Sequence, residues 1–382
     1  MEEKDSESMK DWKERSMEER EKAPQILQVL EALKQATRHI QRHHTSDSPA
    51  VKALLEFQTI LSSSDPKLYA LSDYLNRLKT LLHSLNNSKG LRSFLTRPLS
   101  SHSLSRLAVS IESEIQAWID RETLLALSAS LRNPSDGVSE LVALLTQFRD
   151  RISQGFNREL QDLVLKLKLF YSLETVLLDE KYADRVREHG GLAVAALIRF
   201  NKDVFVGQVM MGPTVRALVS MGSVHSLEVL CSLIRSIRSP LVDEIESNGG
   251  IPKVIALLNS RDLQLQVLAL ECVLEIGYFG RKEAVEAMVK EGLVEKLVEL
   301  QRAENGGDLI EIGKERVCGV LETFPFASCV ARFAVQLEVG EGLRQREKRA
   351  FKPEILVRVR EASLSDAEAA TIAAEVLWGS SP

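Results

Sequence analysis

The segment from Gly249 to Gln301 constrains the fold of this chain more than any other, because it sets out a pattern of helices and then begins that pattern again. It opens as Gly-Gly-Ile-Pro ahead of a short apolar helix and continues into an almost wholly apolar stretch at Leu263–Ile276. A third helical run follows at Arg281–Glu291, and Gly292 restarts the pattern as Gly-Leu-Val. In the short helix, apolar residues recur three, four and seven positions apart, which is one face of a helix. The segment therefore predicts a repeated unit of three helices.

The spacing of equivalent residues supports this repeat. Pro213 and Pro252 are 39 residues apart, and Pro252 and Val294 are 42 residues apart. Repeats of about 40–47 residues with two or three helices each form extended helical arrays. One such unit cannot bury its own apolar faces, so neighbouring units must stack to do it.

The long helix predicted at Leu263–Ile276 carries a single polar seam. Its only polar residues are Gln264, Gln266, Glu271 and Glu275. At about 100° per residue, the first, third and fourth of these fall in one narrow stripe. A helix that is apolar on every other side is packed between neighbours and shows one edge to water.

These residues resemble the armadillo repeat family. The resemblance is carried by Gly-Gly-Ile-Pro at Gly249, Ala-Leu-x-x-Val-x-x-Ile at Ala269–Ile276 and Val-x-x-Gly at Val289–Gly292, and it extends over Met211–Gln301. It implies an all-α fold in which armadillo-like repeats form a right-handed α-solenoid. It also implies a groove, lined by the long helices, that binds a peptide or helix of a partner protein.

The resemblance points to specific positions in that groove. Armadillo proteins that carry nuclear-import cargo present a recurrent Trp and Asn there, and the matching positions in this chain hold Glu271 and Glu275, with Cys231 and Arg235 in the preceding unit. Neither Trp nor Asn occurs at any of the four, which argues against a cargo receptor. We expect instead a partner-binding groove whose two glutamates face a basic partner; the alternative is that these side chains only form a solvated edge. The expected groove residues are Arg235, Gln264, Glu271 and Glu275.

Composition narrows the classes of function. Aromatic residues make up only 5% of the chain, while Leu, Ala, Ser and Glu are abundant, which favours helices over sheets. The net charge is −5, so we expect no nucleic-acid partner, because phosphate binding needs clustered positive charge. The N-terminal stretch is charged, and no run approaches the roughly 18 apolar residues of a membrane span. We therefore expect no transmembrane segment and a cytoplasmic or nuclear protein.

All four cysteines lie in apolar helical runs, and none has the close spacing of a zinc knuckle. We expect buried free thiols in a reducing compartment. They are Cys231, Cys272, Cys318 and Cys329.

Taken in order, the chain predicts three parts: a charged, disordered tail at residues 1–22, a helical bundle at 23–180 with long helices at Val138–Leu178, and a repeat array at 181–382. Within the array, we expect a turn at His189–Leu192 and a helix at Ala327–Lys352. Ser365-Asp-Ala-Glu368 is a capping box that opens a final helix ending at Trp378, and we expect this end to cap the array with a polar outer face.

The bundle is similar to the helical N-terminal domain of plant U-box/armadillo proteins. The similarity is carried by the Trp-Ile-Asp-Arg phrase at Trp118–Arg121, which precedes a leucine-rich helix. It implies a link to ubiquitin signalling. However, the Cys-Pro-Ile, Asp-Pro and Gly-x-Thr-Tyr phrases of a U-box are absent, so the resemblance implies an adaptor, competitor or substrate-side factor rather than a ligase.

No motif in the sequence predicts catalysis, a cofactor or a metal. His39 and His43 share a helix face but lack a third ligand, and we interpret them as a solvated basic helix end. The segment Gly306–Glu315 fails as a phosphate loop, since its glycines are one residue too far apart and Glu replaces the Mg²⁺-binding hydroxyl. The basic cluster from Arg344 to Arg349 is a nuclear-import signal, a patch for an acidic partner or a solvated helix face.

The function expected from the sequence is a non-enzymatic protein-interaction scaffold or adaptor that binds a peptide or helix. The alternative is a membrane- or cytoskeleton-associated factor that docks through its N-terminal bundle. The sequence does not identify the partner or the oligomeric state.

Overall fold

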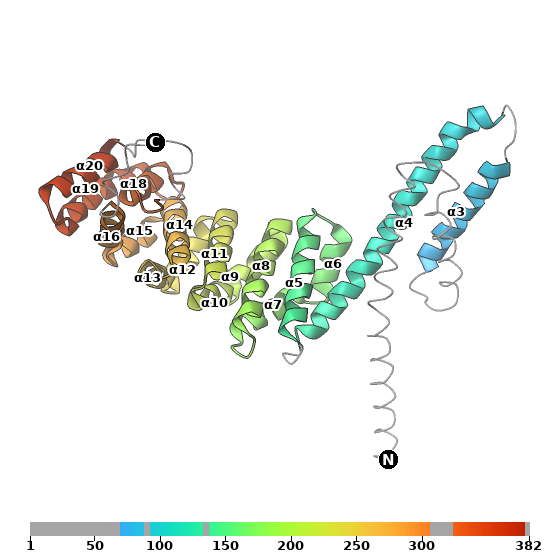
Figure 1. Cartoon of the computed structure of the whole chain (residues 1–382), viewed down its shortest axis with the longest axis horizontal. Coiled ribbons are helices and arrows are strands. Elements are labelled where there is room, and N and C mark those ends of the chain that lie inside the picture. Colours follow the sequence, from blue (N-terminus) through green and yellow to red (C-terminus); the bar gives the residue numbers. More distant parts are fainter. Residues whose placement is uncertain (1–68, 88–91, 133–136, 306–323, 379–382) are drawn as a thin grey trace, which may run out of the picture. The chain divides into compact units, whose positions relative to one another are not determined.

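The chain is all-α in the part that the computed structural model describes, residues 69–87, 92–132, 137–305 and 324–378. These residues form seventeen helices and no strand (Figure 1). The all-α solenoid predicted from the sequence is confirmed. No single helix within these ranges is long and apolar enough to span a membrane; one pair, Lys202–Met211 and Thr214–Met221, meets the length and composition criterion jointly but is bent by 71°.

The chain divides into two compact units. The first combines Met1–Ala126 with Asn157–Leu167, and the second combines Leu127–Phe156 with Lys168–Pro382. In the first unit, the described helices are α3 (Tyr69–Asn87), most of α4 (Arg92–Ser130) and α6 (Arg158–Lys166). Their buried apolar side chains include Leu75, Leu78, Ile111 and Ile115.

The second unit contains the repeat array. Its helices are α5 (Val138–Ser153), α7 (Leu169–Leu178), α8 (Asp184–Phe200), α9 (Lys202–Met211), α10 (Thr214–Met221), α11 (Val224–Ile237), α12 (Ser239–Ser247), α13 (Gly250–Leu257), α14 (Leu263–Phe279), α15 (Lys282–Lys290), α16 (Leu293–Asn305), α18 (Cys329–Val339), α19 (Gln345–Ala362) and α20 (Asp366–Trp378). Helices α5 and α7, which lie in the predicted bundle, belong to this unit by their contacts. The predicted domain limits themselves stay a prediction.

Three successive units each supply three helices, α9–α10–α11, α12–α13–α14 and α15–α16–α18. The third helices of the units pack against one another in the order α8, α11, α14, α18, with α5 before them and α20 after them (Figure 1). We call the side of the array formed by α8, α11, α14 and α18 the third-helix face. Its apolar flanks are buried between neighbours, as the sequence of α14 predicts.

Side-chain contacts between units measure the repeat directly. Asp262 caps the N-terminus of α14, and Ser223, 39 residues earlier, caps α11. Three side-chain hydrogen bonds each join residues 40 positions apart, two of them between neighbouring units and the third within the unit α12–α13–α14. They are Thr214 to Glu174 at 2.8 Å, Arg235 to Glu275 at 2.7 Å, and Ser239 to the carbonyl of Phe279 at 2.7 Å.

The turn glycines of the repeat have the conformation that the pattern requires. Gly249 lies between α12 and α13 with φ +63°, and Gly292 lies between α15 and α16 with φ +78°. This left-handed region costs little only for glycine. The first-to-second-helix turn predicted from Gly-Gly-Ile-Pro is therefore present in both units.

The turn predicted at His189–Leu192 is wrong, because both glycines lie inside α8. Gly190 and Gly191 are buried, and a Cβ on Gly191 would lie 3.2 Å from Leu218 Cδ2 and 3.5 Å from Val229 Cγ2. These glycines serve close packing against neighbouring helices and not a turn. At Gly249, by contrast, the glycine forms the turn between two helices.

The helix predicted at Ala327–Lys352 is also wrong, because it is broken between α18 and α19. The break packs backbone to backbone on the end of α14, since the N–H groups of Glu341 and Gly342 donate to the carbonyl of Tyr278 at 2.8 and 3.1 Å. A Cβ on Gly342 would collide with the carbonyl of Gly280. The glycines at 340 and 342 thus end one helix instead of weakening a continuous one.

Two further boundaries differ from the predictions. Val138–Leu178 forms three helices and not one or two long ones, because Asn157 caps α6 by accepting from Leu160 N at 2.9 Å and Lys168 adopts a left-handed φ of +53° before α7. At the C-terminal end, Ser365 accepts from Glu368 N at 3.2 Å, so the predicted cap is present. The outer face there is less polar than expected, because Leu364 is 80% and Trp378 is 86% exposed.

Candidate partner-binding face

The four predicted groove residues all lie on α11 or α14, two adjacent helices of the third-helix face. Gln264 is exposed in the first turn of α14, where its backbone N–H donates to the capping carboxylate of Asp262 at 2.9 Å. Arg235 lies near the end of α11, and Glu271 and Glu275 lie on the second half of α14. The structure thus groups the four on one face, and whether they bind a partner stays a prediction.

Arg235 joins the two glutamates into one charged cluster. Its Nε donates to Glu275 Oε1 at 2.7 Å, and its terminal nitrogen lies 3.7 Å from Glu271 Oε2. The hydrogen bond to Glu275, together with the carboxylate charges, raises the pKa of Arg235 above its ordinary value. One guanidinium between two carboxylates leaves a net charge of −1 at this place, and not the two free negative charges that the sequence suggests.

The two glutamates differ in how much of the carboxylate stays available. Side-chain exposure is 46% for Glu271 and 21% for Glu275. Glu275 is also closer to Arg235 by 1.0 Å, so it serves mainly as the contact between units. Glu271 is the member of the cluster that a partner can reach and pair with.

Cys231 and Cys272 lie beneath this cluster and come from the same two helices. Both are free and buried, so the predicted place of Cys231 on the exposed seam is wrong. A hydrogen bond between the two thiols and the burial of Cys272 raise the pKa of Cys272 well above its ordinary value. The thiol of Cys272 therefore stays protonated, and both buried side chains pack between α11 and α14. Cys329 is also buried, and its thiol donates to the carbonyl of Leu297 at 3.2 Å, while Cys318 lies outside the described residues.

A second cross-unit ion pair follows at the end of α11, and sequence reasoning missed it. Arg238 lies 3.0 Å from Glu341, which is 103 residues away, and its guanidinium stacks 6.0 Å from the ring of Phe279. No local pattern links residues so far apart. The backbone of Arg238 has an unusual positive φ of 71°, but this conformation is visible only in the structure.

The other sequence candidates for a metal or phosphate site are not among the described residues. Among the described residues, no group of three or more His, Cys, Asp and Glu side chains could hold a metal ion. His39 and His43 precede Tyr69, the first described residue. The segment Gly306–Glu315 lies in the gap between Asn305 and Phe324.

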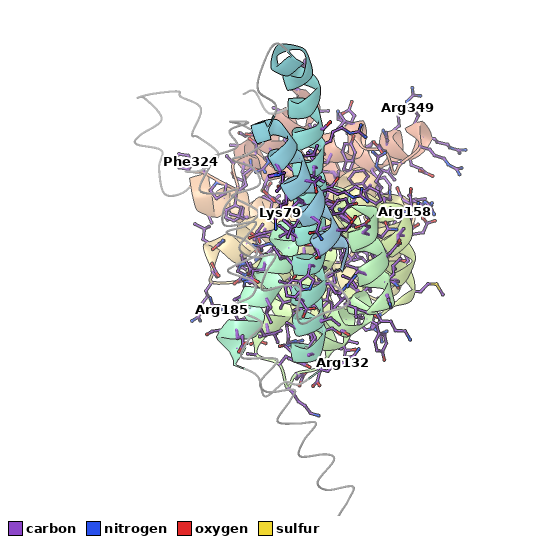
Figure 2. All side chains as sticks on the ribbon, turned by 90° about the vertical axis from the view of Figure 1, so that its right-hand side faces the viewer. Lys79, Arg132, Arg158, Arg185, Phe324 and Arg349 are labelled. Carbon is purple, nitrogen blue, oxygen red and sulfur yellow. The ribbon has the colours of Figure 1, made fainter. Side chains whose placement is uncertain are left out.

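The basic cluster Arg344–Arg349 occupies the start of α19. Arg344, Arg346 and Arg349 are exposed, and Figure 2 shows Arg349 at the margin of the molecule. Lys348 donates to the carbonyl of Gly340 at 2.7 Å and helps to hold the break before the helix. Part of the cluster is thus structural, and which of the three expected roles its exposed arginines have stays a prediction.

Comparison with known proteins gives structural neighbours only. No protein-family model matches the sequence, and no curated protein matches it. Among solved structures, a designed armadillo repeat protein has a TM-score of 0.43 at 13% identity, covering 66% of this chain and 98% of its own. Another, from work on computationally designed armadillo repeat proteins for modular peptide recognition, has a TM-score of 0.44 at 14% identity, with coverage of 66% and 98%. A third, a designed armadillo repeat protein in complex with the peptide (KR)4, has a TM-score of 0.42 at 15% identity, covering 66% and 97%. The description of this chain as a stack of three-helix repeats rests on its own helices and contacts.

Proposed function

We propose that this chain is a non-enzymatic interaction scaffold that binds a peptide or helix of a partner protein along its third-helix face. The observation that carries the proposal is the exposed charged cluster of Arg235, Glu271 and Glu275, which lies across two adjacent units of the array. A stack of similar units presents equivalent side chains at regular intervals, which suits an extended partner.

The cluster also suggests the chemistry of the partner. Its net charge of −1 and the exposed carboxylate of Glu271 favour a basic side chain on the partner. A basic group that reaches Glu271 can form a charge-assisted hydrogen bond without breaking the 2.7 Å contact between Arg235 and Glu275. Because the cluster is partly exposed, we expect it to contribute to partner selection and association rate more than to raw affinity.

The test is a charge swap that preserves the internal ion pair. In Arg235→Glu combined with Glu275→Arg, a salt bridge between α11 and α14 can still form, but the order of charges on the face is reversed. We expect proximity labelling in cells with this variant to lose the partners that label with the wild-type chain.

A matched control is available between two neighbouring units, at their first helices α12 and α15. Arg281 and Asp243 form a cross-unit ion pair at 2.8 Å with similar exposure, so Arg281→Asp with Asp243→Arg makes the same kind of change away from the third-helix face. This control should keep the wild-type partner list. An unchanged list for the Arg235/Glu275 swap, or equal losses for both swaps, would show that the third-helix face is not the recognition surface.

A role in ubiquitin signalling is a finer proposal, supported only by the resemblance of the bundle to plant U-box/armadillo proteins. We propose it as an adaptor role in the cytoplasm or nucleus. It predicts that ubiquitin-ligase components are enriched among the partners lost in the Arg235/Glu275 swap, and that a fluorescent fusion of the full chain distributes to one of these compartments. A partner list without such components would contradict the ubiquitin role and leave the scaffold proposal standing.

A further inference from the structure

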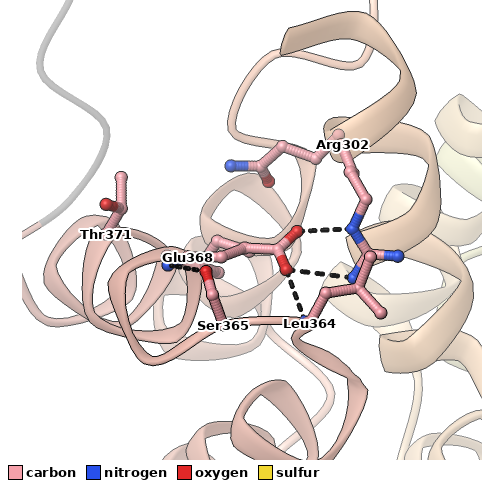
Figure 3. Close-up of a pocket in the computed structure, with 7 residues that line it drawn as sticks. Arg302, Leu364, Ser365, Glu368 and Thr371 are labelled. Carbon is pink, nitrogen blue, oxygen red and sulfur yellow. Dashed lines mark hydrogen bonds and ion pairs between the residues drawn. The ribbon is translucent and has the colours of Figure 1, made fainter. Parts of the chain in front are cut away.

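A pocket lies at the C-terminal end of the array, where the second helix α16 meets α20 (Figure 3). Its volume is about 340 Å³, which is at the small end of the range for ligand pockets and suits a small molecule or a single side chain. The lining includes Gln301 and Arg302 from α16, Leu364 and Ser365 from the loop before α20, and Thr371 and Ile372 from α20. It is separate from the cluster on α11 and α14.

Gln301 is the unusual member of this lining. The residue is 1% exposed, and among the described residues no donor forms a hydrogen bond with its buried side-chain Oε1. The orientation of its amide is fixed by chemistry, since Nε2 donates to Glu375 Oε2 at 2.8 Å and a carboxylate can only accept. A buried acceptor without a donor destabilises the folded state, so its presence calls for an explanation.

Glu375 makes the unpaired oxygen a stronger acceptor. An amide that donates to a carboxylate is polarised, and its own oxygen becomes more negative. Among the described residues, Glu375 has no basic side chain within ion-pair distance, so its negative charge is not cancelled there. The electrostatic environment at Gln301 therefore favours a donor that carries positive charge.

The carboxylate of Glu368, which also lines the pocket, is already paired with Arg302. Arg302 donates to both oxygens of Glu368, at 2.6 and 3.1 Å (Figure 3). It also donates to the carbonyl of Ala362 at 2.8 Å. Glu368 additionally accepts from Leu364 N at 2.7 Å. This pair is electrically balanced and holds the loop in place, so it shapes the pocket without attracting an ion itself.

The remaining wall suits an alkyl chain. Leu364 is 80% exposed at the rim and Ile372 is buried at the base, so an aliphatic stem of a few carbons can lie between them. The hydroxyl oxygens of Ser365 and Thr371 keep lone pairs for a second donor on a multivalent head group.

We propose that this pocket binds an alkylammonium or alkylguanidinium group, with Gln301 Oε1 accepting its N–H and Leu364 and Ile372 covering its stem. The group can come from a lysine or arginine side chain of a peptide or from a free aliphatic amine. This site is independent of the proposed recognition on α11 and α14.

The test is an NMR titration of the full-length, isotope-labelled chain with n-butylammonium, n-butylguanidinium and n-butanol. We expect both cations to shift the side-chain amide resonance of Gln301 and the backbone resonances around Leu364 and Ile372 at millimolar concentration. n-Butanol has the same stem without the charge and should bind at least tenfold more weakly. Equal shifts with the alcohol, or no shift with either cation, would overturn the proposal without recourse to any variant.

A substitution tests the role of the acceptor. Gln301→Met keeps the length of the side chain and removes Oε1, and we expect it to weaken n-butylammonium binding about tenfold. Gln266→Met is the matched control, because Gln266 also donates from a part-buried position on α14 but lies away from the pocket. Unchanged affinity in Gln301→Met would contradict the proposal, and a thermal melt of each variant identifies any that fails to fold.

Two sources of the ligand are distinguished by one more probe. Nα-acetyl-lysine N-methylamide carries the same ammonium on a peptide-like backbone. Binding as tight as that of n-butylammonium supports a peptide side chain as ligand, whereas at least tenfold weaker binding supports a free amine.

Discussion

The middle of the array and its C-terminal end hold their helices together in different ways. Between the central units, side-chain hydrogen bonds join residues 40 positions apart, as between Arg235 and Glu275. At the end, the partners are farther apart in sequence: Arg302 and Glu368 are separated by 66 residues, and Gln301 and Glu375 by 74. The chain between α16 and α18 is longer than the corresponding connection between α13 and α14, which displaces the later partners along the sequence.

The difference shows how a repeat array acquires a distinct site. Where the period is kept, the third helices pack closely and their polar residues are left on one exposed face. Where extra chain interrupts the period, buried polar side chains such as Gln301 and a bidentate ion pair bridge the helices, and a pocket remains. The two regions should therefore respond differently to substitution.

The largest single effect should come from truncating a core side chain. Leu230 of α11 is 0% exposed, so Leu230→Ala should lower the free energy of unfolding by about 4 kcal/mol. Ile372 of α20 is 3% exposed but lines the pocket, so its removal enlarges a space that solvent can fill, and Ile372→Ala should cost about 2 kcal/mol. Urea denaturation of both variants measures the difference, and equal losses would remove the distinction between the regions.

A smaller effect is expected where the break before α19 touches α14. In Gly342→Ala the new methyl group meets the backbone carbonyl of Gly280, which cannot move cheaply, so the free energy of unfolding should fall by about 3 kcal/mol or somewhat less. Gly207→Ala is the control, because Gly207 is exposed inside α9 with no atom within 4 Å of the added methyl group. That variant should gain about 0.5–1 kcal/mol, so the two glycines should change stability in opposite directions.

The bidentate pair at the end predicts a pH dependence. The hydrogen bonds from Arg302 lower the pKa of Glu368 below its ordinary value of 4.5. Because the folded-state pKa is depressed, the stabilisation is present above pH 4.5 and is lost as the pH falls through the folded-state value. Glu368→Gln should thus lower the free energy of unfolding by about 1 kcal/mol at pH 7 and by less at pH 3. A cost that is the same at both pH values would show that the charge of Glu368 does not stabilise this end.

The smallest effect should come from the exposed cluster in the middle. A double-mutant cycle with Arg235→Met and Glu275→Gln should give a coupling free energy of about 0.5 kcal/mol, because exposed ion pairs contribute little. Raising the salt concentration to about 1 M should reduce it further through screening. A coupling above about 2 kcal/mol would mean that the cluster is built for stability, which would weaken its assignment as a recognition surface.

The sequence predicts the central region well because its information is local and periodic. Turn glycines, helix caps and the polar seam of α14 all recur within about 40 residues, so the units and the exposed stripe of Glu271 and Glu275 could be read directly. The same pattern could not show that Arg235 from the preceding unit reaches that stripe, because side-chain conformations are set by packing. The misread turn in α8 has a related cause, since a glycine can serve either a turn or a close helix contact, and only the neighbouring helices decide between them.

The contacts and the pocket at the C-terminal end of the array could not be predicted from the sequence in this way. Gln301 and Glu375 are ordinary polar residues of amphipathic helices, and no spacing rule links positions 74 residues apart. The pocket depends on long-range contacts that have no counterpart in the repeat. A buried glutamine is a recognisable signal only after the structure shows that the residue is buried.

The central claim, that the third-helix face recognises a partner, is tested most directly by hydrogen–deuterium exchange of the full chain with a peptide selected against it from a random library. The account predicts slower amide exchange in α11 and α14 when the peptide is bound, and no such slowing when the Arg235/Glu275 swap is mixed with the same peptide. Slower exchange confined to the first helices α12 and α15, with α11 and α14 unchanged, would contradict it.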